Sequence, residues 1–86
     1  MYQINPKVLK TPVEDGKILL LEPKTGMYYE LDETSCHIFQ LLSQGETSES
    51  IVQKLVENYD VSNHQAEEDY QLFLQQLIEK NIVFEG

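Results

Sequence analysis

The sequence predicts an α+β domain in which a three-stranded antiparallel sheet is followed by three helices, arranged like a winged helix-turn-helix. The first third of the chain contains three short, mostly apolar stretches separated by turn signals. The remainder contains three amphipathic stretches that begin with capping residues. Strands and helices in separate parts of a chain are typical of α+β folds. We expect one domain over residues 1–86, with a disordered start over residues 1–6.

The first two strands are expected at residues 8–13 and 17–22. Pro12 confines the first of them to a sheet edge, because proline cannot donate to a neighbouring strand. Residues 14–16, Glu-Asp-Gly, favour a two-residue hairpin loop at Asp-Gly. The continuous apolar run KILLLE then reads as the central strand.

A tight turn at residues 23–26, Pro-Lys-Thr-Gly, leads to a third strand at residues 27–31. Side chains alternate between the two faces of such a strand. One face holds Met27, Tyr29 and Leu31, and the other holds Tyr28 and Glu30. If the strands pair in chain order, the outer edge of this third strand has no partner.

The first two helices are expected at residues 32–44 and 48–59. Asp32 can cap the first of them, and Gly45 ends it. Thr47 can cap the second. The apolar residues of both stretches recur at the spacing of a buried helical face.

The third helix is expected to begin at Ser62 or Asn63 and to end at Asn81. Its apolar positions form one stripe: Ala66, Tyr70, Phe73, Leu74, Leu77 and Ile78. Residues 82–84 are apolar, and we expect them to fold back on the core.

The charge balance argues against nucleic-acid binding. The chain has 15 acidic residues, 6 lysines, no arginine and a net charge of −9, whereas nucleic-acid binding depends on cations that neutralise phosphates. The acidity either suits a basic partner or keeps a small domain soluble. No apolar run approaches the roughly 18 residues of a membrane span, and the N-terminus lacks a signal-peptide pattern. We therefore expect a cytoplasmic protein that does not bind membranes.

No residue pattern points to catalysis, a metal or a cofactor. Cys36 is the only cysteine and is expected to be a small buried residue, since its neighbour His37 would not face it on a helix. His37 and His64 each lack further ligands at metal spacing. An enzyme or metalloprotein is therefore the less favoured hypothesis.

The unpaired edge of residues 27–31 suggests a binding function. Proteins with such an edge can bind an extended peptide as an added strand. The third helix could form a wall beside it, where Leu72 lies opposite the apolar stripe, close to Asp69 and Gln76. Self-association of the same edge into a weak homodimer is a further hypothesis that is compatible with peptide binding.

Several motifs in a fixed order resemble the PqqD-like family over residues 8–84. They are GxYYxL, ThrxxxIVxxL, YDV and AEEDxxxFLxxL. The matching residues are Gly26, Tyr28, Tyr29, Leu31, Phe39, Leu41, Leu42, Ile51, Leu55, Tyr59, Val61, Asp69, Phe73, Leu74 and Leu77. Phe39 stands where the family often has Trp, and Asn81 where it often has Gly.

This resemblance implies a non-catalytic adaptor for ribosomally made, post-translationally modified peptides. Such domains hold the leader segment of a precursor peptide as an extra strand and present it to a separate processing enzyme. Carried over to this chain, the leader would pair with residues 27–31 and contact the third helix near Asp69, Phe73 and Gln76. We favour a lasso-peptide leader peptidase as the partner enzyme, with a radical-SAM enzyme as the alternative. A winged-helix DNA-binding protein is the remaining alternative.

Overall fold

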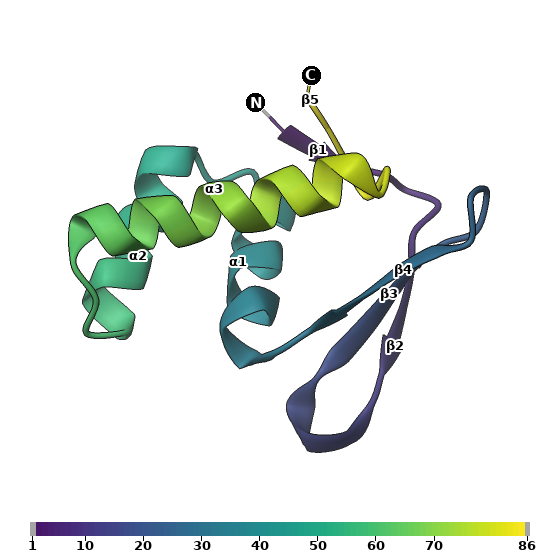
Figure 1. Cartoon of the computed structure of the whole chain (residues 1–86), viewed down its shortest axis with the longest axis horizontal. Coiled ribbons are helices and arrows are strands. Elements are labelled where there is room, and N and C mark those ends of the chain that lie inside the picture. Colours follow the sequence, from purple (N-terminus) through teal and green to yellow (C-terminus); the bar gives the residue numbers. More distant parts are fainter. Residues whose placement is uncertain (1, 86) are drawn as a thin grey trace.

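Two antiparallel sheets and three helices make up the fold in a computed structural model that describes residues 2–85, apart from the side chain of Asp15 (Figure 1). The strands are β1 Tyr2–Ile4, β2 Leu9–Pro12, β3 Ile18–Glu22, β4 Met27–Leu31 and β5 Val83–Glu85. The helices are α1 Glu33–Ser43, α2 Ser48–Asn58 and α3 Asn63–Glu79. The predicted α+β class is confirmed, and the winged helix-turn-helix description fits it approximately.

The larger sheet has the strand order β2-β3-β4, as predicted. β3 lies in the centre, and β4 pairs with it from Glu22↔Met27 to Ile18↔Leu31. Gly26 has φ 75°, and its N–H donates to the C=O of Glu22 at 2.9 Å, which closes the predicted turn. Among the described strands, none pairs with the outer edge of β4.

The second sheet, made of β1 and β5, differs from the prediction. We expected a disordered start, whereas Tyr2–Ile4 pairs with Val83–Glu85. Met1, which that expectation also covered, lies outside the described residues. The apolar end of the chain does fold back on the core, where Ile82 and Val83 are buried. β1 and β5 therefore lie side by side above the C-terminal part of α3 (Figure 1).

The loop between β2 and β3 was predicted incorrectly. Instead of a two-residue hairpin loop, a 3-10 turn at Glu14–Gly16 occupies the middle of a longer connection. Pro12 pairs with Ile18, and the N–H of Val13 donates to the C=O of Lys17 at 3.0 Å. Gly16 supplies the positive φ, 73°, that this longer loop requires.

The predicted caps begin the three helices. The side chains of Asp32, Thr47 and Ser62 accept hydrogen bonds from main-chain N–H groups three residues later, at 2.8–3.1 Å. After α1, Gly45 has φ 80°, and after α3, Asn81 has φ 59°. Both residues adopt the left-handed backbone conformation that commonly ends a helix.

The core lies between α3, α1, α2 and the inner face of the sheet. Its fully buried side chains include Leu20 and Leu31 from the sheet and Tyr70 and Leu77 from α3. The hydroxyl of Tyr70 shares a hydrogen bond of 2.9 Å with Ser48 on α2, so its burial leaves no polar atom unpaired. This packing fixes the position of α3 relative to the sheet, with its C-terminal part close to β4 (Figure 1).

Candidate functional site

The loop between β2 and β3 shows which way the main-chain groups of the sheet point. The N–H of Val13 donates to Lys17, so residue 13 directs its hydrogen-bonding groups toward β3. These directions alternate along an antiparallel strand. Leu9 and Thr11 therefore also face β3, whereas Pro12 faces away from it. Proline has no N–H, and at this position the sheet does not need one.

The same alternation, carried across β3, identifies the free groups of β4. On β3, Leu19 and Leu21 are the partners of Thr11 and Leu9, so their main-chain groups face β2. Leu20 lies between them, so its main-chain groups point the other way and bond its partner Tyr29 on β4. Tyr28 and Glu30, on either side of Tyr29, therefore direct their N–H and C=O groups away from β3. These main-chain donors and acceptors form the open edge of the sheet, which is the main feature of the site.

Tyr29 connects β4 to α3. Its ring meets the ring of Phe73 edge-on, with the centroids 5.8 Å apart. Its hydroxyl donates to Oε1 of Gln76 at 2.5 Å, and Nζ of Lys80 lies 5.8 Å from its ring centroid. Burial, and then the charge of Asp32, raises the pKa of Tyr29, so the hydroxyl remains a donor at neutral pH. The distance between β4 and α3 is thus set by side chains of both elements.

A groove of about 490 Å³ lies between β4 and the C-terminal part of α3. It is lined by Tyr28, Tyr29, Glu30, Gln76, Glu79 and Lys80. The first four are among the candidate site residues named from the sequence, whereas Glu79 and Lys80 are not. Residues three and four positions apart share a helix face, so extending the predicted wall beyond Gln76 would have identified both.

The other predicted site residues occupy three different environments. Leu31 and Phe73 are 0% and 7% exposed, so their side chains belong to the core. Met27 is 43% exposed at the start of β4. Asp69 and Leu72 are exposed on α3 but do not line this groove, and Asp69 accepts a hydrogen bond from Gln65 at 2.8 Å.

The turn that begins β4 is held by Glu22, whose side chain is 3% exposed. Its Oε2 accepts from the hydroxyl of Thr25 at 2.6 Å and from the N–H of Thr25 at 2.7 Å. These two bonds hold the pKa of Glu22 below its usual value, against the opposing effect of burial. The ionised carboxylate therefore stabilises the turn.

We expect the stability of the protein to fall in acid partly because of Glu22. A lowered pKa in the folded state stabilises the fold above the unfolded-state pKa, near 4.5, and this stability is lost as pH falls through the lowered value. Glu22→Gln should therefore lower the unfolding free energy at pH 7 and make its decline below pH 4.5 shallower. Urea unfolding between pH 7 and pH 3 tests this; parallel profiles for variant and wild type would refute it.

The residues considered for chemistry do not form a reactive cluster. Cys36 is partly buried, burial raises the pKa of its thiol, and Sγ lies 3.6 Å from the C=O of Leu31. Nδ1 of His37 lies 3.1 Å from the hydroxyl of Tyr59, and His64 pairs with Glu68 on the surface. Among the described side chains, no three potential ligands gather as a metal site requires. None of the helices within residues 2–85 is long and apolar enough to cross a membrane.

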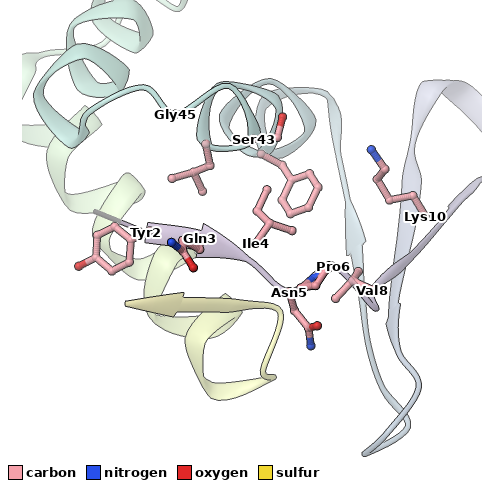
Figure 2. A pocket seen from close by; sticks show the side chains of 11 residues that line it. Tyr2, Gln3, Ile4, Asn5, Pro6, Val8, Lys10, Ser43 and Gly45 are labelled. Atoms are coloured by element: carbon pink, nitrogen blue, oxygen red, sulfur yellow. The ribbon is translucent and has the colours of Figure 1, made fainter. Parts of the chain in front are cut away.

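A separate cavity of about 470 Å³ lies between β1 and the C-terminal part of α1 (Figure 2). Tyr2, Ile4 and Phe39 give it apolar walls, and Lys10 is the only charged side chain among its lining residues. It shares no lining residue with the groove between β4 and α3. This cavity therefore offers no acid–base pair and lies apart from the open edge.

Comparison with protein-family models identifies one family. The sequence model of Coenzyme PQQ synthesis protein D (PqqD) matches residues 17–83. A solved structure of TbiB1 in complex with the TbiA(beta) leader peptide is 30% identical, with a TM-score of 0.86, over 98% of this chain and 96% of that one. A lasso peptide synthetase B1 complexed with the leader peptide is 25% identical, with a TM-score of 0.86, over 98% of each chain. No curated protein matches the chain.

Proposed function

Because this chain belongs to the PqqD family, we propose that it is a non-catalytic adaptor that binds the leader segment of a precursor peptide as an added strand on β4. The observation that carries the proposal is the open edge of β4, where the main-chain groups of Tyr28 and Glu30 point outward beside α3. An extended peptide can complete such an edge with main-chain hydrogen bonds. The two similar structures, each a complex with a leader peptide, support this reading.

The proposed site has a main-chain part and a side-chain part. Tyr28 and Glu30 bond the leader through their main chains, and Met27 contributes its exposed side chain at the start of β4. Tyr29 and Gln76 form the floor of the groove, with Glu79 and Lys80 beside them. Leu31 and Phe73 contribute by supporting β4 and α3 from the core, and Asp69 and Leu72 continue the wall along α3 for a longer leader.

The proposed role also requires a partner that carries out the chemistry. We propose a separate processing enzyme in the cytoplasm, and favour a leader peptidase because one similar structure is a lasso peptide synthetase B1. A DNA-binding role is disfavoured by the net charge of −9 and the lack of arginine.

An NMR titration tests the proposal. The probe is a synthetic peptide with the sequence of the leader encoded beside the gene of this protein, added to ¹⁵N-labelled protein. We expect the largest amide shifts at Tyr28 and Glu30, smaller shifts at Gln76 and Lys80, and none in α2. Unchanged β4 signals at millimolar peptide would refute leader binding at this edge.

A further inference from the structure

A pocket of about 710 Å³ opens beside the turn that precedes β4, and we call it the turn-end pocket. Its lining residues are Asn5, Pro6, Lys7, Glu22, Pro23, Lys24, Asn81 and Phe84. It adjoins both walls of the groove. Asn81 directly follows Lys80 of the groove, and Glu22 pairs with Met27, the first residue of β4. A peptide lying along β4 and continuing past Met27 would therefore reach this pocket.

The floor of the turn-end pocket is held by buried polar groups. Asn5 is 8% exposed, and its Nδ2 donates to the C=O of Asn81 at 2.9 Å. Its main-chain N–H donates to the C=O of Ile82 at 2.8 Å. Glu22, the other buried polar residue of the described chain, is fixed by Thr25. Because these groups are already bonded, the floor is formed before any ligand binds, which lowers the entropic cost of binding.

The walls and rim of the pocket differ in chemistry. Phe84 is 44% exposed and stands with Pro6 and Pro23 as an apolar wall. Lys7 and Lys24 are exposed at the rim. Among the described side chains, the lysines that lie within ion-pair distance of a carboxylate are Lys17 and Lys54, so neither rim lysine has an acidic partner there. Glu22 also lines the pocket, and its carboxylate stays ionised while it accepts the hydrogen bonds from Thr25, so the two lysines and this glutamate leave the lining with a net charge of +1.

The charge of the whole chain makes this rim distinctive. The protein has a net charge of −9 and only six lysines, two of which lie at this pocket. At the groove, Glu79 offsets Lys80, and Glu30 is paired with Lys17 at 3.7 Å. A carboxylate on a bound peptide is therefore repelled along most of the surface and attracted at the turn-end pocket.

We propose that the turn-end pocket is a second subsite for the leader, which takes a bulky apolar side chain together with a nearby Asp or Glu from the segment that continues past Met27. The inference rests on the proposed function, because it places the same peptide. The apolar side chain packs against Phe84 and the prolines, and the carboxylate lies between Lys7 and Lys24. Since only one end of the groove has this chemistry, the subsite fixes the direction of the leader along β4.

The test compares two double charge reversals by fluorescence anisotropy with the labelled leader peptide described above. We expect Lys7→Glu/Lys24→Glu to weaken binding on the order of tenfold, more at low than at high salt. The control Lys10→Glu/Lys54→Glu changes the net charge equally, away from the pocket, and should change affinity less than twofold. Phe84→Ser tests the apolar wall and should also weaken binding. Circular dichroism establishes that each variant is folded.

A leader with its Asp and Glu residues replaced by Asn and Gln provides the reciprocal test. It should bind the wild type about as weakly as the normal leader binds the Lys7→Glu/Lys24→Glu variant, and it should bind both proteins alike. If the rim variant keeps wild-type affinity, or if both double variants lose affinity equally, the subsite is refuted while leader binding at β4 stands. If the wild type itself does not bind the leader, the proposed function fails.

Discussion

Replacing Tyr28 with proline is expected to weaken leader binding by about 30-fold or more and to leave the domain folded. Proline removes the outward N–H of Tyr28, and its ring obstructs the incoming strand. A lost hydrogen bond of about 1 kcal/mol, together with this obstruction, gives an effect of that size. The fold should tolerate the change, because this N–H does not bond β3 and proline is accepted on edge strands. Isothermal titration calorimetry with the leader peptide measures the affinity.

Two control variants, Tyr28→Ala and Tyr29→Pro, separate the loss of the outward N–H from other effects of the substitution. Tyr28→Ala keeps the main chain and should reduce affinity much less than Tyr28→Pro, because the main-chain bond remains. Tyr29→Pro removes an N–H that bonds β3, so it should unfold the hairpin rather than only weaken binding. If Tyr28→Pro binds normally while Tyr29→Pro remains folded, the main-chain directions deduced for β4 are reversed.

Leu31→Ala is expected to lower the unfolding free energy by about 2–5 kcal/mol, because it leaves a cavity at a fully buried position. For a domain of this size, such a loss lowers the melting temperature by roughly 10–30 °C. The affinity of the protein that remains folded should change little, since the Leu31 side chain does not reach the groove. Urea unfolding followed by circular dichroism measures the effect.

Leu72→Ala is the matched control, because Leu72 is the same residue type but 59% exposed. We expect its unfolding free energy to stay within about 0.5 kcal/mol of the wild type. A stable Leu31→Ala protein that no longer binds the leader would instead give the Leu31 side chain a direct role in binding.

The parts of the fold that the sequence predicts correctly depend on local signals. The central strand β3, the alternation of β4 and the caps Asp32, Thr47 and Ser62 each follow from residues close together in the chain. The β1–β5 sheet could not be predicted in this way. Its strands have three residues each, which is too short to show the alternation of apolar and polar residues that marks a strand. The two strands also lie at opposite ends of the sequence, so no local signal links them.

Local signals also named four of the six residues that line the groove. Alternation correctly placed Tyr29 and Leu31 on one face of β4, but it does not show how deeply a side chain is buried, so the full burial of Leu31 required the packed structure. The outward direction of the Tyr28 and Glu30 main chains depends on the register with β3, which alternation within a single strand does not give. The turn-end pocket joins the first residues to the last ones, and no local motif marks it.

The open edge of β4 has a further consequence for the protein on its own. Edge strands are usually blunted by lysine or proline, but either residue here would block the proposed binding of a leader. Two unliganded copies would instead be kept apart by their shared negative charge, which acts over about 10 Å at 0.1 M salt and only about 3 Å at 1 M. Concentrated, high-salt preparations should thus be the conditions that promote edge-to-edge aggregation. Low protein concentration and low salt should limit this aggregation during purification and storage.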